Sequence, residues 1–250
     1  MNTRATRIRI DQLLAQRSLA ASRSRARDMI ARGCVTIDGQ KIVKAGTLVS
    51  HECNVEINDP GQSYVSRAAL KLIAGLDADG IDVSGTTAVD LGASTGGFTQ
   101  VLLERGAASV LAIDAGHDQL VAEIANDPRV SNLEGTNARY LTPDILTPRP
   151  DLIVSDLSFI SLILAVEPAL LLSADTARCV LLVKPQFEVG REGIGKGGLV
   201  TDQKLIEHTL AHIKDWFGDL PGWKITKFLP SPIKGGDGNS EYLLCGARHS

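Results

Sequence analysis

A glycine-containing segment is the first place in the sequence where residue types and spacing suggest chemistry. It reads DLGASTGGFT, from Asp90 to Thr99, and lies between an apolar run and a helical pattern. Gly92 and Gly96 are four residues apart, so the segment lacks the G-x-G-x-x-G spacing of a dinucleotide-binding turn. The carboxylate before the first glycine would repel a pyrophosphate, but it could accept hydrogen bonds from a cationic or hydroxyl-bearing ligand. The segment therefore indicates a ligand other than a dinucleotide.

The surrounding segments predict the sheet that positions this turn. Apolar strand patterns alternate with helical ones, and the strands are expected within residues 86–92, 109–116, 151–159 and 179–187. Continuously apolar strands that alternate with helices are typical of a parallel sheet covered on both faces. We therefore expect a doubly wound, Rossmann-like α/β domain, in which ligands bind at the carboxyl ends of the strands. Asp114 ends one of these strands, where a carboxylate can bind both hydroxyls of a ribose.

Together, the glycine turn and the two strand-end carboxylates favour an adenosine ligand that carries a positive charge instead of phosphates. S-adenosylmethionine is such a ligand. The residues expected to hold it are Asp90, Gly92, Ser94, Thr95, Gly96, Gly97, Phe98, Asp114, Asn137 and Asp156. The alternative is an ordinary tight turn between strand and helix, because short glycine motifs often occur without a ligand.

The first fifty residues are strongly basic. They hold ten basic and three acidic residues, a net charge of +7, whereas the whole chain carries −3, so the remainder carries −10. This asymmetry indicates a contact with nucleic acid or another anionic surface, and the alternative is a set of solvated helix faces. Arg23 and Arg27 are one helical turn apart and could contact successive phosphates. The residues expected to bind RNA are Arg7, Arg9, Arg23, Arg25, Arg27 and Arg67.

The basic region also has the helix, turn and linker signals of a small domain. Its apolar spacing predicts two short amphipathic helices joined near Ser22, which is a suitable N-cap, and Gly33 would end the second helix. Asp38 and Gly39 stand between alternating apolar residues and predict a hairpin. An Asp-Pro-Gly sequence then indicates a linker near residues 59–63. We expect an α+β RNA-binding domain over residues 1–60 and a methyltransferase-type domain over residues 61–250.

Other features argue against a metal site and against a membrane protein. The four cysteines form no C-x-x-C pair, which fits a reducing cytoplasm, and His208 and His212 have no third ligand nearby in sequence. The N-terminus lacks the apolar core of a secretory signal. Glu167 and Pro168 interrupt the most apolar window, which is too short to span a bilayer. The chain is therefore expected to be soluble and cytoplasmic, and a monomer is favoured.

Five motifs, in this order, resemble those of a known family. They read YVSRAALKL, DLGASTGGFTQVLL, VSDLSFISL, LLVKPQFEVGRE and GGDGNSEYLL. They are similar to the TlyA family, whose members are described as haemolysins or as rRNA ribose methyltransferases, with a catalytic domain related to the FtsJ-type RNA 2′-O-methyltransferases. The basic N-terminal region resembles the small RNA-binding domain first described in ribosomal protein S-four. The resemblance covers nearly the whole chain.

The resemblance implies a catalytic tetrad and a reaction. FtsJ-type enzymes use a Lys-Asp-Lys-Glu set, and the matching positions are Lys71, Asp156, Lys184 and Glu241. The implied reaction is S-adenosylmethionine-dependent methylation of a ribose 2′-hydroxyl, of a cytidine, in ribosomal RNA or ribosomal subunits. Lys184 is the expected general base or stabiliser of the alkoxide, with Lys71 beside the same oxygen and the carboxylates orienting the lysines. On local grounds alone, Glu241 could instead pair with Lys234.

The sequence also separates this reaction from its alternatives. Amino-group methyltransferases carry an Asn/Asp-Pro-Pro-aromatic run where this chain has Asp156, Leu157, Ser158 and Phe159. The Pro-Cys dipeptide common in enzymes that methylate carbon 5 of cytosine does not occur in the sequence. A ribose oxygen is therefore the favoured target. A haemolysin or membrane-active protein and a non-catalytic RNA-binding module are the competing hypotheses, and neither a membrane partner nor a metal is expected.

Overall fold

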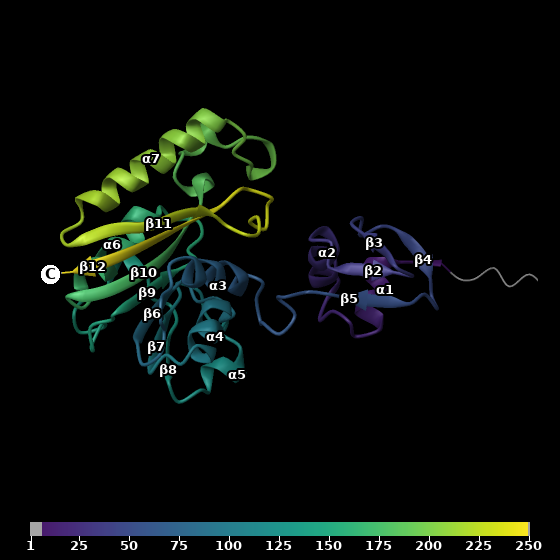
Figure 1. The fold of residues 1–250 in the computed structure, drawn as a ribbon, viewed down its shortest axis with the longest axis horizontal. Coiled ribbons are helices and arrows are strands. Elements are labelled where there is room, and N and C mark those ends of the chain that lie inside the picture. The colour runs from purple at the N-terminus through teal and green to yellow at the C-terminus, as the bar shows by residue number, and fades with distance from the viewer. Residues whose placement is uncertain (1–6, 250) are drawn as a thin grey trace, which may run out of the picture. The chain divides into compact units, whose positions relative to one another are not determined.

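The chain divides into two compact units, each with its own hydrophobic core. The computed structural model describes residues 7–249. The first unit ends at Gln62 and the second begins at Ser63. Figure 1 colours the first unit purple to blue and the second blue to yellow. The basic region of the sequence therefore lies in the first unit, and the glycine turn in the second.

The first unit contains the predicted helices and hairpin and additional short strands. Ser22 is the N-cap of its second helix, because its Oγ accepts a hydrogen bond from the backbone N–H of Arg25 at 3.1 Å. Asp38 and Gly39 both have positive φ, of 48° and 78°, which suits a two-residue hairpin turn. The elements are β1 (Arg7–Arg9), α1 (Ile10–Gln16), α2 (Arg23–Ala31), β2 (Val35–Ile37), β3 (Gln40–Ile42), β4 (Leu48–Ser50) and β5 (Val55–Ile57).

The strands of the first unit form two small antiparallel sheets. β2 and β3 make the predicted hairpin, and β5 pairs with the other edge of β2. β1 pairs with β4, a pairing that the sequence pattern did not predict. Side chains from α1 and α2, including Ile10, Leu13, Leu14, Met29 and Ile30, fill the core of this unit.

The second unit is built on a seven-stranded sheet in the order β11-β12-β10-β9-β6-β7-β8. The strands from β6 to β10 are mutually parallel, and β12 is antiparallel to both of its neighbours. This arrangement confirms the predicted doubly wound fold, whereas β11 and β12 were not predicted. The strands are β6 (Thr87–Leu91), β7 (Ser109–Ile113), β8 (Val130–Leu133), β9 (Leu152–Ser155), β10 (Thr176–Val183), β11 (Trp223–Pro230) and β12 (Tyr242–His249).

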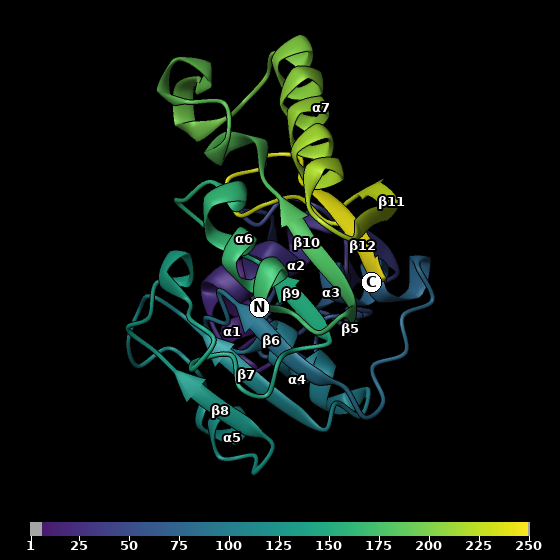
Figure 2. The ribbon, with the colours of Figure 1, turned by 90° about the vertical axis from the view of Figure 1, so that its left-hand side faces the viewer.

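Helices cover both faces of this sheet (Figure 1 and Figure 2). Successive residues of β6, Ala88 and Val89, enter different cores, because successive side chains of a strand point to opposite faces of the sheet. The core with Ala88 includes α3 and α4, and the core with Val89 includes α6 and α7. The helices of this unit are α3 (Ala69–Ala78), α4 (Gly97–Glu104), α5 (Ala122–Ala125), α6 (Leu162–Leu172) and α7 (Gln203–Asp219), with short 3₁₀ turns at Ala138–Tyr140, Pro185–Phe187, Arg191–Gly193 and Lys196–Gly198.

The order of the strands places a ligand site at one edge of the sheet. The chain runs outward from β6 through β7 to β8 and then returns to the other side of β6 to form β9 and β10. Open parallel sheets bind ligands where the strand order reverses in this way, at the carboxyl ends of the strands. Because β12 is antiparallel to β10, its first residues lie at that same edge. The edge therefore collects residues from both halves of the second unit.

Candidate active site

Two lysines and two carboxylates form a linked cluster at this edge of the sheet. Lys71 Nζ lies 2.6 Å from Glu241 Oε2 and 3.8 Å from Asp156 Oδ2. Lys184 Nζ lies 2.6 Å from Asp156 Oδ1 and donates a hydrogen bond to Ser158 Oγ at 2.8 Å. The structure thus brings together all four residues that match the Lys-Asp-Lys-Glu set, and Asp156 bridges the two lysines.

Each member of the cluster comes from a different element. Asp156 directly follows β9 and Lys184 directly follows β10, so both stand at the carboxyl ends of neighbouring parallel strands. Glu241 directly precedes β12, and the first residue of β12 pairs with the last residue of β10. Lys71 reaches the cluster from α3. The antiparallel strand is therefore what carries a carboxylate from the end of the chain to this edge.

The cluster is almost fully removed from solvent. The side chains of Lys71, Lys184 and Glu241 are 7%, 8% and 3% exposed, and that of Asp156 is 15% exposed. Buried charges are tolerated when opposite charges offset them, and this cluster holds two cations and two anions. Glu241 has its cationic partner in Lys71, whereas the local sequence alone also allowed Lys234. The paired charges hold the four side chains in fixed positions.

A cavity of about 310 Å³ opens on the cluster. Its walls include all four cluster side chains, the glycine turn and the rings of Phe159 and Phe187. A second cavity, of about 530 Å³, shares Gly92, Ser94 and Asp156 with the first and extends past Asp114. Because the two cavities share walls, a group bound in the second would reach the cluster that lines the first.

The backbone of the glycine turn is shaped for close approach. Gly92 has a φ of +85°, and a Cβ at this position would lie 2.9 Å from the backbone oxygen of Asp156. A larger residue would therefore clash with the end of β9. Ser94 also has a positive φ, of 47°, and its backbone N–H donates to Asp114 Oδ2 at 2.8 Å. Asp114 Oδ1 accepts from the backbone N–H of Gly116 at 2.7 Å, so this carboxylate holds the turn and the next loop together.

Most of the predicted cofactor-binding residues line at least one of the two cavities. They are Gly92, Ser94, Thr95, Gly97, Phe98, Asp114, Asn137 and Asp156. Neither cavity wall includes Gly96 or Asp90. Gly96 has a φ of +99° and forms the N-cap of α4. Asp90 is fully buried, because its side chain points from β6 toward α4, where its Oδ2 accepts a hydrogen bond from Thr99 Oγ1 at 2.7 Å.

Burial changes the acid–base behaviour of Asp90. Removal from water raises the pKa of its carboxyl to about 7, and the negative charges of Asp156 and Asp114 act in the same direction. In the unfolded chain an aspartate loses its proton near pH 4. Between pH 4 and pH 7 the folded state therefore binds more protons than the unfolded state, and the contribution of Asp90 to stability falls as the pH rises.

We expect Asp90→Asn to remove this pH dependence. The amide oxygen can still accept from Thr99 but the side chain no longer titrates. The free energy of unfolding of the variant, relative to that of the original protein, should therefore increase between pH 4 and pH 7, by at most about 1.4 kcal/mol per pH unit. Urea unfolding without cofactor at pH 4.5, 6 and 8 measures this difference. A difference that is the same at all three values would contradict the raised pKa, since any fixed cost of the amide is independent of pH.

Phe159, for which the sequence pattern predicted no role, lines both cavities. Its side chain is 91% exposed and its φ is +62°, a backbone conformation that few aromatic residues adopt. Its ring lies 5.2 Å from that of Phe187, centroid to centroid. Glu188 fixes the same loop, since its carboxylate accepts from Ser161 Oγ at 2.8 Å and from the backbone N–H of Leu162 at 2.6 Å. An aromatic residue three positions after a strand-end aspartate is the sequence signal for this site.

Three of the arginines expected to bind RNA share one buried carboxylate in the first unit. Asp11 is fully buried, and the guanidinium groups of Arg9, Arg23 and Arg27 each lie 3.0 Å from its oxygens. These hydrogen bonds hold the pKa of Asp11 well below its usual range, and the bond from Arg9 has the largest effect. In this structure Arg23 and Arg27 therefore converge on one group instead of pointing separately outward. Their side chains remain about half exposed, at 45% and 55%.

The other predicted RNA-binding arginines are placed differently. Arg25 donates a short hydrogen bond to the backbone oxygen of Gly61 and lies 3.7 Å from Asp59, so it ties α2 to the end of the first unit. Arg7 is exposed at the start of β1. Arg67 belongs to the second unit, two residues before α3. Of the six, the Asp11-linked three form the single compact group of cations.

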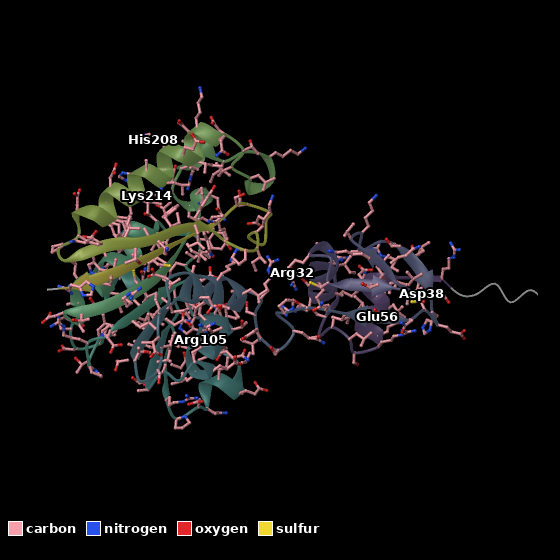
Figure 3. The ribbon with its side chains drawn as sticks, in the orientation of Figure 1. Arg32, Asp38, Glu56, Arg105, His208 and Lys214 are labelled. Carbon is pink, nitrogen blue, oxygen red and sulfur yellow. The ribbon has the colours of Figure 1, made fainter. Side chains whose placement is uncertain are left out.

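The structure of residues 7–249 contains neither a candidate metal site nor a helix that could span a membrane. No three His, Cys, Asp or Glu side chains in this range are grouped so that they could hold a metal ion. His208 and His212 both lie on the exposed side of α7, where Figure 3 labels His208. None of the helices in the described part of the chain is both long enough and apolar enough to cross a membrane.

Comparison with known proteins accounts for both units. The family model for FtsJ-like methyltransferases matches residues 64–248, and that for the S4 domain matches residues 8–52. The chain is 47% identical to the 16S/23S rRNA (cytidine-2′-O)-methyltransferase TlyA of Mycobacterium tuberculosis, over 96% of this chain and 90% of that protein. It is 38% identical to Hemolysin A of Brachyspira hyodysenteriae, over 94% of this chain and 98% of the relative. The solved structure of a candidate hemolysin from Streptococcus thermophilus has a TM-score of 0.71 and 34% identity, covering 98% of this chain and 90% of that one.

Proposed function

The chain belongs to the FtsJ-like methyltransferase family, in its TlyA group, and from this premise we propose that it transfers a methyl group from S-adenosylmethionine to a ribose 2′-hydroxyl of a cytidine in ribosomal RNA. The observation that carries the proposal is the buried cluster of Lys71, Asp156, Lys184 and Glu241 beside the glycine turn. A methyl transfer to a hydroxyl needs both a cofactor site and charged groups at the oxygen. The cluster lines the first cavity, and the second cavity, which we propose for the cofactor, adjoins it.

The second cavity fits an adenosine ligand that carries a positive charge. Gly92 and Ser94 of the glycine turn line this cavity, and Gly92 has to be a glycine because a Cβ there would meet the backbone oxygen of Asp156. Asp114 would accept from the ribose hydroxyls with its remaining lone pairs, and the apolar side chains of Ile113, Leu157 and Ile160 would surround the adenine. Asp156 offers a carboxylate where this cavity meets the first. When bound, S-adenosylmethionine supplies an electrophilic methyl group on a sulfonium centre.

The cluster would prepare the hydroxyl for attack. Lys184 stands at the first cavity with its Nζ held by Asp156 and Ser158. Its ammonium can therefore stabilise the negative charge that develops on the ribose oxygen as the oxygen takes the methyl group and its proton passes to solvent. Lys71 forms an ion pair with Glu241, and its ammonium is a second cation held in place at the same wall. Much of the rate would come from positioning, because holding the oxygen in line with the methyl group contributes about 7–11 kcal/mol. Phe159 offers an exposed ring for the base of the same nucleotide.

The first unit would bind the RNA through the cations around Asp11. Three guanidinium groups and one carboxylate leave a net charge of +2 on a compact, half-exposed surface. Because Asp11 fixes the three side chains, little side-chain entropy is lost when they contact phosphates. Arginine contacts of this kind position an RNA backbone without reading its sequence.

Removal of one of these cations should weaken RNA binding in a salt-dependent way. We expect Arg23→Ala to lower the affinity for rRNA and to reduce the slope of log K against log salt by roughly one unit, because one phosphate contact is lost. Filter binding at several salt concentrations measures both quantities. Arg105→Ala is the matched control, since Arg105 is an arginine of the second unit that pairs with Asp77. An unchanged slope for Arg23→Ala would mean that the basic group is only a solvated face.

A direct assay tests the proposed function. Ribosomal RNA from cells that lack this gene is incubated with the purified protein and tritiated S-adenosylmethionine, and the methylated riboses are then mapped. We expect label in a ribose of one or more cytidines. Absence of label, with lysis of erythrocytes by the same preparation, would favour a membrane-active protein instead. Absence of both, with RNA binding retained, would favour a non-catalytic module.

A further inference from the structure

We propose that Arg139 and Tyr140 form a second base-binding site, which holds an unpaired RNA base next to the methylated nucleotide. The proposal rests on the proposed function, because it assumes that the second unit acts on RNA. It adds a contact surface outside the tetrad, the cofactor cavity and the basic group around Asp11. Neither residue was expected from the sequence to take part in binding.

The two residues directly follow a wall segment of the second cavity, the one proposed to hold the cofactor. Asn137 and Ala138 line that cavity, and Arg139 and Tyr140 follow them directly in a 3₁₀ turn. Asn137 Oδ1 accepts a hydrogen bond from the backbone N–H of Arg139 at 3.1 Å and so caps the turn. On its inner side, Ala138 is buried and packs in the core that contains α6. The turn is therefore capped by Asn137 and anchored in the core by Ala138, which places Arg139 and Tyr140 next to the cavity wall.

The side chains of this pair are presented to solvent in an ordered form. Tyr140 is 69% exposed, and the guanidinium carbon of Arg139 lies 5.9 Å from the centre of its ring. Such a cation–π contact restrains two side chains that would otherwise be mobile on the surface. The pair offers an aromatic face together with a positive charge.

The distribution of exposed aromatic residues supports a specific role. Aromatic residues make up only 4% of the chain. Within residues 7–249, the large apolar side chains that are exposed include two aromatic ones, Phe159 and Tyr140. Phe159 stands three positions after Asp156, and Tyr140 stands three positions after Asn137. Both of these polar residues line the second cavity at the carboxyl edge of the sheet. Two exposed rings on loops at the same edge are unexpected if exposure is accidental.

An unpaired nucleobase fits the chemistry of this pair. Proteins that recognise single-stranded or looped RNA stack its bases on aromatic rings and on arginine planes. The stacking term is insensitive to the identity of the base, and an adjacent guanidinium adds attraction to the phosphate. With Phe159 beside the tetrad and Tyr140 beside the cofactor cavity, the edge would hold two bases of one strand.

Kinetics on rRNA test this site. We expect Tyr140→Ala to raise the KM for rRNA about tenfold, since loss of a base-stacking ring has an effect of that order. The kcat at saturating RNA and the Kd for S-adenosylmethionine should stay unchanged, because Tyr140 is not a member of the tetrad and lines neither cavity. Tyr140→Phe should keep the original KM, since it keeps the ring. Arg139→Gln should raise the KM by a smaller factor and reduce its salt dependence.

A control variant and the possible outcomes distinguish a failure of the second base site from a failure of the proposed function. Leu164→Ala removes a side chain on α6 that is 52% exposed and should leave the KM unchanged. If the unaltered protein methylates rRNA and Tyr140→Ala has the original KM, the second base site is overturned while the proposed function stands. If Tyr140→Phe loses as much as Tyr140→Ala, stacking is not the interaction, and the inference also fails. A protein that methylates no RNA overturns the function itself.

Discussion

Lys184→Ala is expected to abolish ribose methylation, lowering the single-turnover rate by about 10²–10⁴-fold, while the affinity for S-adenosylmethionine stays nearly unchanged. The reason is positional. Lys184 stands at the end of β10, with its Nζ 2.6 Å from Asp156 and facing the first cavity, and it does not line the second cavity. Its charge can therefore act on the accepting oxygen without supporting the adenosine.

Single-turnover methylation with tritiated cofactor, run beside calorimetric titration of each variant, separates the two effects. Lys196→Ala, at an exposed lysine of the same connection between β10 and α7, should behave like the original protein. The variant should fold, because Asp156 keeps Lys71 within 3.8 Å as a cationic partner. Methylation by Lys184→Ala at close to the original rate would show that another group activates the hydroxyl.

The neighbouring members of the cluster should differ in kind. Lys71→Ala and Glu241→Ala each break the 2.6 Å pair and should also reduce turnover strongly, since each leaves an uncompensated charge beside the oxygen. Asp156 lines both cavities, so its loss should weaken both cofactor binding and chemistry. A loss of turnover with cofactor binding retained in the Lys71 and Glu241 variants would distinguish a catalytic cluster from a merely structural one.

Asp114→Ala should weaken the binding of S-adenosylmethionine by about 10- to 100-fold, because hydrogen bonds to a charged group contribute about 1.5–3 kcal/mol. Two losses combine. The ribose hydroxyls would lose their acceptor, and the backbone N–H groups of Ser94 and Gly116, at 2.8 and 2.7 Å, would lose the carboxylate that holds them. Calorimetric titration of the free protein measures the effect.

The matched control is Asp144→Ala, which removes an exposed carboxylate elsewhere in the second unit and should leave the affinity unchanged. Equal affinity of Asp114→Ala and the original protein would exclude Asp114 from the cofactor site. Tight binding of NAD, with no response to S-adenosylmethionine, would show that the second cavity takes a different nucleotide.

Much of the fold and part of the site followed from the sequence alone. Apolar strands that alternate with helices, such as the one that ends before Asp114, predicted a parallel sheet, and the strand ends at Asp114, Asp156 and Lys184 were then expected to meet at one edge. Ser22 and the Asp38–Gly39 turn were predictable because their chemistry acts on the backbone of their own neighbours. These features depend on local structure and on the period of the chain.

The tertiary structure decided what depends on distant parts of the chain. Glu241 reaches Lys71 because an unpredicted antiparallel strand carries it back to the edge, which no local pattern specifies. Asp90 is the opposite case, because its place near a strand end predicted a ligand contact. The alternation of side chains along the strand instead turns it toward α4, where it is buried against Thr99. The convergence of Arg9, Arg23 and Arg27 likewise required packing of α1 against α2 around Asp11. Sequence determines which residues share a face or an edge, whereas only packing determines which charges meet and which are closed off from solvent.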